Sequence, residues 1–193
     1  MVGRVEPVIR KLVEFLQTSD FAGVIFSRIP VEGTFPIEEV RTGSDSGPDV
    51  IVSMRWNADR NEHGTPGLQI SEGGTKGKGH HVSLSFFDMH NTLVAAGPDF
   101  KRGFIDELPS GNVDVAPTIL HILGVPQPAS SPMDGRVLLE ALASGTPGVD
   151  SPKTKTLDAS RELGLFHWRQ YLKFTEYEGT IYFDEGNGQP TPK

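Results

Sequence analysis

The chain contains no cysteine, so disulfide bonds, thiol catalysis and cysteine-ligated zinc or iron–sulfur centres are excluded. A metal ion would have to be held by histidine and carboxylate side chains. Long hydrophobic runs are lacking too, since a stretch such as residues 93–96 falls far short of the roughly 18 residues that a membrane helix needs. The first ten residues carry no apolar signal-peptide core. We therefore expect a soluble chain with neither a membrane segment nor a signal peptide.

Positive charge is also scarce. The 193 residues include 18 Lys and Arg against 25 Asp and Glu, which gives a formal net charge of −7. The broad basic surface typical of nucleic-acid-binding proteins is therefore missing, and we expect no nucleic-acid partner. Hydrophobic residues make up 36% of the chain, and its 22 Gly and 15 Pro indicate a folded protein with an unusual amount of loop.

Hydrophobic periodicity predicts an α/β protein. Apolar residues recur at helical spacing over residues 5–17, which predicts a helix. Short β-rich runs at residues 23–27, 49–54 and 91–97 are typical of buried strands in a parallel sheet.

The second half of the chain adds helices and a hairpin. Asp114 can cap a helix that ends at Gly124, and Asp134 can cap a shorter helix that reaches Leu142. Apolar and polar residues alternate over residues 166–174, and Glu178-Gly179 precedes another β-rich run. This pattern predicts an antiparallel hairpin with one buried face.

A glycine-rich segment, residues 64–79, is the first candidate for chemistry. It has 6 glycines in 16 residues, which predicts a long loop of a kind that is often functional but is also common as plain surface. A phosphate-binding P-loop is excluded, because Glu72 stands where its first glycine is required and Gly79 where its Ser or Thr is required. The loop ends at His80-His81. Neighbours in an extended segment point to opposite faces, so at most one of this pair can bind a given metal ion, and a solvated surface pair is the alternative.

The other histidines give weaker signals. His63 and His90 lie near predicted strand ends, where the sites of α/β proteins gather. His121 lies on the predicted second helix and His167 on the exposed face of the tail strand, so packing and solvent exposure explain these two better. No Gly-x-Ser-x-Gly motif marks a nucleophilic serine.

Three segments resemble the alkaline phosphatase superfamily. Residues 79–100, Gly-His-His-Val-Ser-Leu-Ser-Phe-Phe-Asp-Met-His-Asn-Thr-Leu-Val-Ala-Ala-Gly-Pro-Asp-Phe, are similar to its late catalytic block. Residues 112–120 resemble its Asp-hydrophobic-Ala-Pro-Thr helix, and residues 133–136 its Asp-Gly-Arg turn. The resemblance covers roughly residues 23–143 and is closest to type I phosphodiesterase/nucleotide pyrophosphatase and sulfatase-like members.

The resemblance implies a partial alkaline-phosphatase-like three-layer α/β fold, with a mostly parallel sheet and a C-terminal antiparallel hairpin. Residues 1–145 would form the C-terminal part of a catalytic domain. Residues 146–193 would be a linker plus the hairpin tail, packed on the same core.

The resemblance also implies a metal site. His81 matches the family histidine that binds one of two zinc ions, although Val82 replaces the small residue that usually follows it. The family's nucleophile and other metal ligands precede these segments, so we expect a truncated chain whose catalytic residues lie elsewhere. Because a lone histidine cannot hold a dinuclear centre, activity would require the missing N-terminal part or another chain.

The implied function is that of the C-terminal portion of a zinc-dependent hydrolase, inactive alone. In the complete enzyme the substrate would be a small phosphate ester, a phosphodiester or a sulfate ester. Relatives are often exported, which leaves the compartment of this chain open. The alternative is a non-catalytic module that keeps the fold and binds a partner through residues 64–79 or through the tail hairpin.

Overall fold

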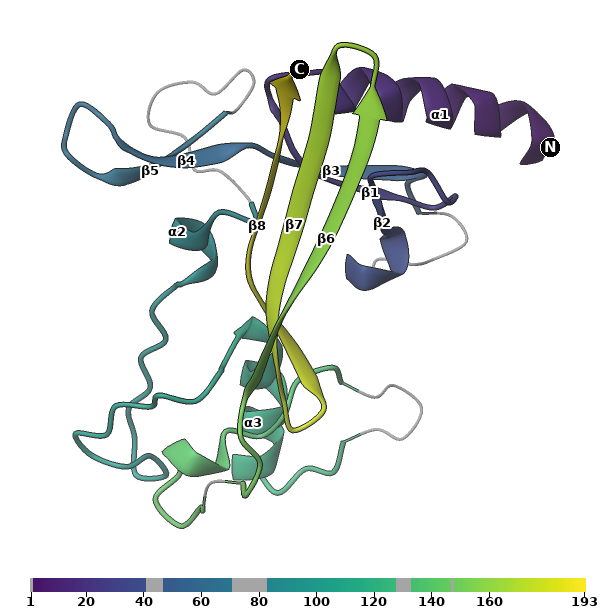
Figure 1. Cartoon of the computed structure of the whole chain (residues 1–193). Coiled ribbons are helices and arrows are strands. Elements are labelled where there is room, and N and C mark those ends of the chain that lie inside the picture. Colours follow the sequence, from purple (N-terminus) through teal and green to yellow (C-terminus); the bar gives the residue numbers. More distant parts are fainter. Residues whose placement is uncertain (1, 41–46, 71–82, 128–132, 147) are drawn as a thin grey trace. The chain divides into compact units, whose positions relative to one another are not determined.

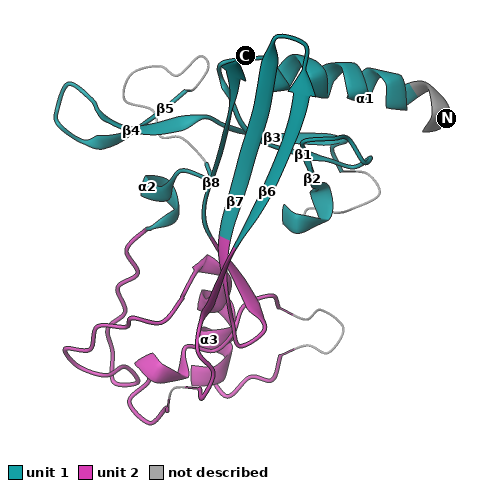
Figure 2. Cartoon of the chain, in the orientation of Figure 1, with its two compact units in different colours: residues 1–90, 156–173, 184–193 teal, residues 91–155, 174–183 magenta. Residues whose placement is uncertain are grey.

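The structure, a computed structural model, describes residues 2–40, 47–70, 83–127, 133–146 and 148–193. The chain divides into two compact units (Figure 2). Unit 1 comprises residues 1–90, 156–173 and 184–193, and unit 2 comprises residues 91–155 and 174–183. Each unit therefore combines an earlier stretch of the chain with part of its C-terminal strands. The division into residues 1–145 and 146–193 stays a prediction.

The first helix, purple in Figure 1, confirms the helix predicted at residues 5–17. It is α1 (Val2–Gln17), and it buries Ile9, Val13 and Leu16 in a core that includes Trp168. Each such side chain contributes roughly 1.5–3 kcal/mol when it is fully buried. The apolar spacing in the sequence thus identifies the face of α1 that packs against the core.

A three-stranded sheet in the order β2-β1-β3 packs in unit 1. Its strands are β1 (Ala22–Ser27), β2 (Phe35–Pro36) and β3 (Val50–Met54), and the 3-10 helix η1 (Ile37–Val40) follows β2. β1 is buried along its whole length. The two strands predicted near residues 23–27 and 49–54 are confirmed in position. β1 and β3 pair antiparallel, whereas β1 and β2 pair parallel.

The described strand pairs are therefore mostly antiparallel, whereas we predicted a mostly parallel sheet. The prediction rested on continuous apolar runs, which are typical of parallel strands. A strand buried on both faces has the same run whichever way its neighbour points, so the run fixes burial and not direction. The three-layer alkaline-phosphatase-like fold stays a prediction.

The next two strands form a separate hairpin, β4 (Trp56–Arg60) with β5 (Pro66–Gln69). β5 lies in the segment predicted as loop, where it pairs with β4. Within it, Gly67 has a φ of +93° and lies directly against the ring of Phe87. A Cβ at this glycine would lie 2.6 Å from that ring. Phe87 belongs to the short helix α2 (Phe86–Met89). Residues 71–79 of the predicted loop lie outside the described residues.

Three long strands end the chain, β6 (Lys153–Leu163), β7 (Phe166–Tyr177) and β8 (Thr180–Pro192), which lie side by side in that order (Figure 1). Two-residue turns join them, which requires antiparallel neighbours. The predicted tail hairpin corresponds to β7 and β8. In unit 1, the buried side chain of Gln170 accepts a hydrogen bond from Ile25 N at 2.8 Å and donates one to Ile25 O at 3.1 Å. The Gln170 amide thus provides hydrogen-bond partners for the N–H and C=O of Ile25, the residue just before β1 begins to pair with β2 at Phe26.

Unit 2 contains the 3-10 helix η2 (Asn112–Asp114) and α3 (Val115–Ile122). Gly124, with a φ of +64°, follows the C-cap residue of α3. The predicted second helix is confirmed in position, but Asp114 makes no side-chain capping hydrogen bond, because its carboxylate accepts from Gly111 N and Arg136 N instead. The third predicted helix is reduced to one 3-10 turn, η3 (Leu139–Ala141). The strand predicted at residues 91–97 is wrong: the segment is irregular, and Val94 is 83% exposed. An apolar run forms a β-strand only when a neighbouring strand pairs with it. No strand in the described residues pairs with residues 91–97.

A candidate functional site in unit 2

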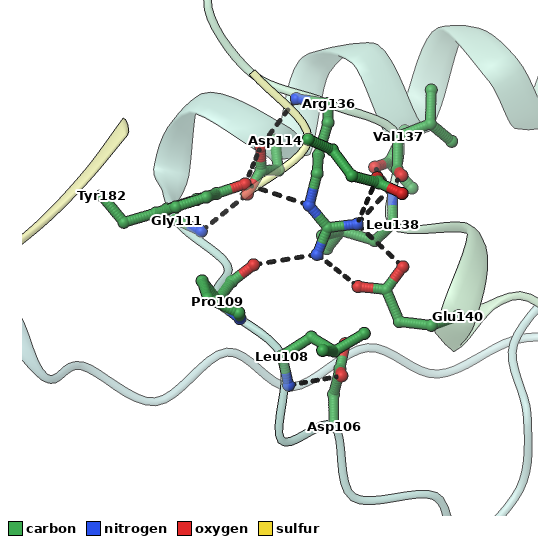
Figure 3. A network of polar contacts seen from close by, with 12 residues as sticks. Asp106, Leu108, Pro109, Gly111, Asp114, Arg136, Val137, Leu138, Glu140 and Tyr182 are labelled. Carbon is green, nitrogen blue, oxygen red and sulfur yellow. Dashed lines mark hydrogen bonds and ion pairs between the residues drawn. The ribbon is translucent and has the colours of Figure 1, made fainter. Parts of the chain in front are cut away.

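A buried network of polar side chains surrounds Arg136 in unit 2 (Figure 3). Arginine carries five N–H groups in a planar fork, and every one of them has an acceptor here. Nε donates to the Tyr182 hydroxyl at 3.1 Å, and Nη1 donates to Glu140 Oε2 at 2.9 Å and to Val137 O at 3.5 Å. Nη2 donates to Pro109 O at 2.8 Å and, in a short contact, to Glu140 Oε1. Arg136 and Glu140 are therefore a bidentate ion pair, with both residues buried.

Asp114 is the second centre of the network and is completely buried. Its Oδ1 accepts hydrogen bonds from Arg136 N at 2.8 Å and from the Tyr182 hydroxyl at 3.2 Å, and its Oδ2 accepts one from Gly111 N at 2.8 Å. A buried carboxylate is tolerated only when donors replace its lost water. These three donors come from the segment before α3, the turn at residue 136 and β8.

The network joins two of the segments that carry the family resemblance. Asp114 and Thr118 belong to the helix motif. Arg136 N donates to Asp114 Oδ1, and Leu138 N donates to the Thr118 hydroxyl at 3.1 Å. Gly135 allows the close approach, since a Cβ there would lie 2.1 Å from Val113 O. The helix motif and the Asp-Gly-Arg turn therefore pack directly against each other, and we call this contact, formed by Asp114, Thr118, Gly135 and Arg136, the joint between the two motifs.

The β7–β8 turn approaches the same arginine. Glu178 has a positive φ of 47°, which is uncommon for a residue other than glycine. Its Oε2 lies 3.6 Å from Arg136 Nη1, and the guanidinium carbon lies 4.6 Å from the centroid of the Tyr177 ring. The Thr180 hydroxyl donates to Asp134 O at 3.1 Å. The turn is thus held against residues 134–136 by charge, ring and hydrogen-bond contacts.

The network shifts the titration of its members. Burial would lower the pKa of Arg136, but the hydrogen bonds and charge of Glu140 outweigh burial and raise it. Burial would raise the pKa of Glu140, and its bonds to Arg136 lower it below the usual range. Burial, followed by the charge of Asp114, raises the pKa of Tyr182 to about 12. The ion pair is therefore charged, and the tyrosine neutral, over the ordinary pH range.

The sequence contained only part of this network. Asp114 and Arg136 lie in two of the resemblance motifs, which give neither residue a site role. Glu140 follows Arg136 by four residues, an ion-pair spacing on a helix or helical turn that could have been noticed. Tyr182 is 46 residues from Arg136, and no local pattern indicates that the two meet.

The predicted metal ligand, His81, lies outside the described residues, as do His80 and Val82. Within the described part of the chain, no group of three or more His, Asp or Glu side chains could hold a metal ion. The carboxylates of Asp114 and Glu140 are saturated by N–H and O–H donors. A zinc role for His81 stays a prediction.

The four other histidines have separate surroundings. His63 Nε2 lies 3.4 Å from Glu62 Oε1 on the surface, and the ring of His90 stacks on Phe86 with centroids 4.1 Å apart. His167 Nδ1 lies 2.5 Å from Glu162 Oε1, and His121 is exposed in the last turn of α3. None of them belongs to a group of metal-ligating side chains among the residues that the structure describes.

Comparison with known proteins yields one partial similarity. A stretch of 57 residues, 30% of the chain, is 46% identical to a Caenorhabditis elegans protein named "Putative extracellular sulfatase Sulf-1 homolog". The stretch spans only 8% of that protein's length. No family model and no solved structure matches the chain. The chain is thus sulfatase-like over this stretch. No helix among the described residues is long and apolar enough to cross a membrane.

Proposed function

We propose that the chain is the C-terminal part of a sulfatase-like hydrolase of the alkaline phosphatase superfamily, acting on esters of sulfuric acid. The observation that carries this proposal is the 46% identity to the nematode sulfatase homologue. The motifs resemble sulfatase-like members and type I phosphodiesterases equally well. The identity to the sulfatase homologue favours the sulfatase-like members. Phosphate esters and phosphodiesters are the neighbouring substrate classes, because the two ester types share a tetrahedral anionic centre.

In this proposal unit 2 is scaffold rather than reaction centre. The polar atoms of Arg136, Asp114 and Glu140 form hydrogen bonds within the network, with Tyr182 and with backbone groups, and all three residues are buried. A group that binds substrate must be reachable and must have a free donor or acceptor. The joint between the two motifs therefore supports the site without forming it.

His81 is the residue of this chain that we assign to the site, as one ligand of a metal ion. Neutral imidazole is a common ligand of zinc. One imidazole cannot hold a metal ion alone, so the remaining ligands and the nucleophile have to come from another segment of the polypeptide or from another chain. We assign no catalytic residue among the described positions.

The test uses the protein as the cell makes it. Its intact mass is measured first, and the purified protein is then assayed for bound metal and for cleavage of p-nitrophenyl sulfate, p-nitrophenyl phosphate and bis(p-nitrophenyl) phosphate. We expect a mass well above 21.0 kDa, bound metal and cleavage of the sulfate ester. We also expect His81→Ala to lose both metal and turnover, whereas the matched control His63→Ala, at an exposed histidine, keeps both.

Each other result changes the proposal in a defined way. Wild-type metal content and turnover in His81→Ala would remove His81 from the site. Cleavage of a phosphate ester without the sulfate ester would move the substrate class to phosphate. A native product of about 21 kDa that binds no metal and cleaves none of the esters would overturn the hydrolase and leave a non-catalytic module.

A further inference from the structure

The β2-β1-β3 sheet of unit 1 has two edges that differ in how well they are protected. The edge strand β2 is two residues long and includes Pro36. Short edge strands and proline are devices that keep a sheet edge from pairing with another chain. The other edge strand, β3, has five residues, Val-Ile-Val-Ser-Met, with neither a charge nor a proline. Among the described strands only β1 pairs with it, so β3 presents an unprotected edge.

Hydrogen bonds show which way the backbone groups of β3 point. Just before β3, Asp49 O accepts from Arg28 N at 2.9 Å, and just after it, Arg55 N donates to Phe21 O at 2.8 Å. Arg28 follows β1 directly and Phe21 precedes it directly. Residues 49 and 55 therefore face β1, and so do the alternate positions between them.

The middle of β3 agrees with this alternation. Val52 lies opposite Ile25 of β1, but the N–H and C=O of Ile25 are both bonded to the side chain of Gln170. The N–H and C=O of Val52 therefore point away from β1, as do those of Val50 and Met54. In the described part of the chain no strand pairs with this side of β3.

A stripe of apolar side chains on α1 faces the same way. Its members are 43–62% exposed and recur at helical spacing: Val5, Val8, Leu12 and Phe15. Gln17 lies on the opposite flank of the helix, and its amide donates at 2.9 Å to Glu32 O, between β1 and β2. The stripe thus lies on the side of the sheet where β3 is the edge.

The sequence around β3 is complementary to itself. When two copies run antiparallel with Val52 opposite Val52, Val50 lies opposite Met54, so outward-pointing backbone groups meet. The same register places Asp49 of each copy opposite Arg55 of the other. These are positions where facing side chains lie closest, and opposite charges there are stabilising. The Asp49 side chain is half exposed, although its Oδ1 also lies 3.4 Å from Arg28 Nε.

We propose that two copies of this chain pair through their β3 edges, antiparallel about Val52, and that their α1 stripes pack together across the same two-fold axis. The contact joins the two sheets into one continuous sheet and satisfies both free edges. Val50 and Val52 pack against the core that contains α1, so both α1 helices lie on one face of the joined sheet. The proposal is independent of the hydrolase function.

The first measurement is the mass of the 193-residue chain by sedimentation equilibrium over a range of concentrations, with amide exchange by NMR. We expect a mass of twice 21.0 kDa, with the Val50 and Val52 amides protected only where the dimer forms. A chain that stays at 21.0 kDa up to its solubility limit overturns the proposal. In a longer native product, a monomeric mass with a protected Val52 amide overturns it too, because another segment of the polypeptide then covers the edge.

The second measurement tests the register by reversing charges. Arg55→Asp places two acids opposite each other at both ends of the contact and should raise the dimer dissociation constant by about tenfold. Asp49→Arg/Arg55→Asp restores opposite charges and should recover most of the affinity. Arg102→Asp, at an exposed arginine of unit 2, is the matched control and should leave the constant unchanged. No recovery in the double variant would overturn pairing about Val52.

The third measurement tests the helix stripe with a variant that keeps the fold, since Val8 is 62% exposed. Val8→Glu places a charge in the apolar contact between the two α1 helices and should raise the dimer dissociation constant by about tenfold or more. Leu123→Glu is the matched control, because this apolar side chain is 66% exposed in unit 2. Equal dissociation constants for Val8→Glu and Leu123→Glu would overturn the packing of the stripes.

Discussion

Replacement of Arg136 by methionine is the sharpest test of the network in unit 2. Methionine keeps much of the aliphatic volume but removes every side-chain donor, so the buried Glu140 loses both N–H partners of its bidentate pair. The Tyr182 hydroxyl loses one donor, while Asp114 keeps its bond to the backbone nitrogen of residue 136. Removing one partner of a buried ion pair costs about 3–5 kcal/mol. That is a large share of the roughly 5–15 kcal/mol that stabilises a domain.

We therefore expect Arg136→Met to lower the free energy of unfolding by about 3–5 kcal/mol, measured by urea unfolding at pH 7 with far-UV circular dichroism. The double variant Arg136→Met/Glu140→Leu should recover much of this loss, because no unpaired charge is then buried. The matched surface control is Arg169→Met. Its partner Asp158 is 2.9 Å away, but both side chains are more than half exposed, so the loss should stay below about 1 kcal/mol. An Arg136→Met loss no larger than that of Arg169→Met would refute the reasoning.

Three further predictions concern the same unit. Gly135→Ala places a Cβ 2.1 Å from Val113 O and should cost about 1–3 kcal/mol in urea unfolding, whereas Gly103→Ala meets no neighbour within 4 Å and should cost only about 1 kcal/mol for its positive φ. Ile119→Glu and Leu123→Glu alter side chains that are 50% and 66% exposed on one face of α3, so they should reduce light scattering at high concentration without loss of unfolding free energy. The pKa of Tyr182 is raised to about 12, so its neutral form favours folding and stability should fall as the pH rises from about 10 to 12. Tyr182→Phe should remove that fall and cost about 1–2 kcal/mol at pH 7.

The sequence predicted local structure well where the local signal was sufficient. α1 was confirmed with its apolar spacing on the buried face. α3 was confirmed in position only, because Ile119 and Leu123 are 50% and 66% exposed and Asp114 makes no capping hydrogen bond. β1 and β3 were placed by their apolar runs, although β1 is buried throughout and β3 is only partly buried. Direction and partners of the strands were not predictable, because they depend on residues distant in the chain. Residues 91–97 illustrate the limit, since their apolar run has no strand partner in the described part of the chain.

The candidate site shows the same division between local and distant information. Arg136 and Glu140 are four residues apart and could be paired from spacing alone. Tyr182 joins them only through β8, so its place in the network required the structure. His81 is assigned to the site by resemblance and lies outside the described residues. Its role as a metal ligand therefore has to be tested by the His81→Ala experiment.

The motifs that make the chain recognisable need not be those that react. Asp114 is buried and bonded to three donors, Thr118 accepts from a loop backbone, and Gly135 has no room for a side chain. Each of these constraints concerns how a helix meets a turn, and none requires a substrate. Such a joint can be kept in an enzyme and equally in a relative without catalysis. A measured stability loss in Gly135→Ala would therefore support the joint and leave the hydrolase undecided, whereas metal loss in His81→Ala would bear on the hydrolase alone.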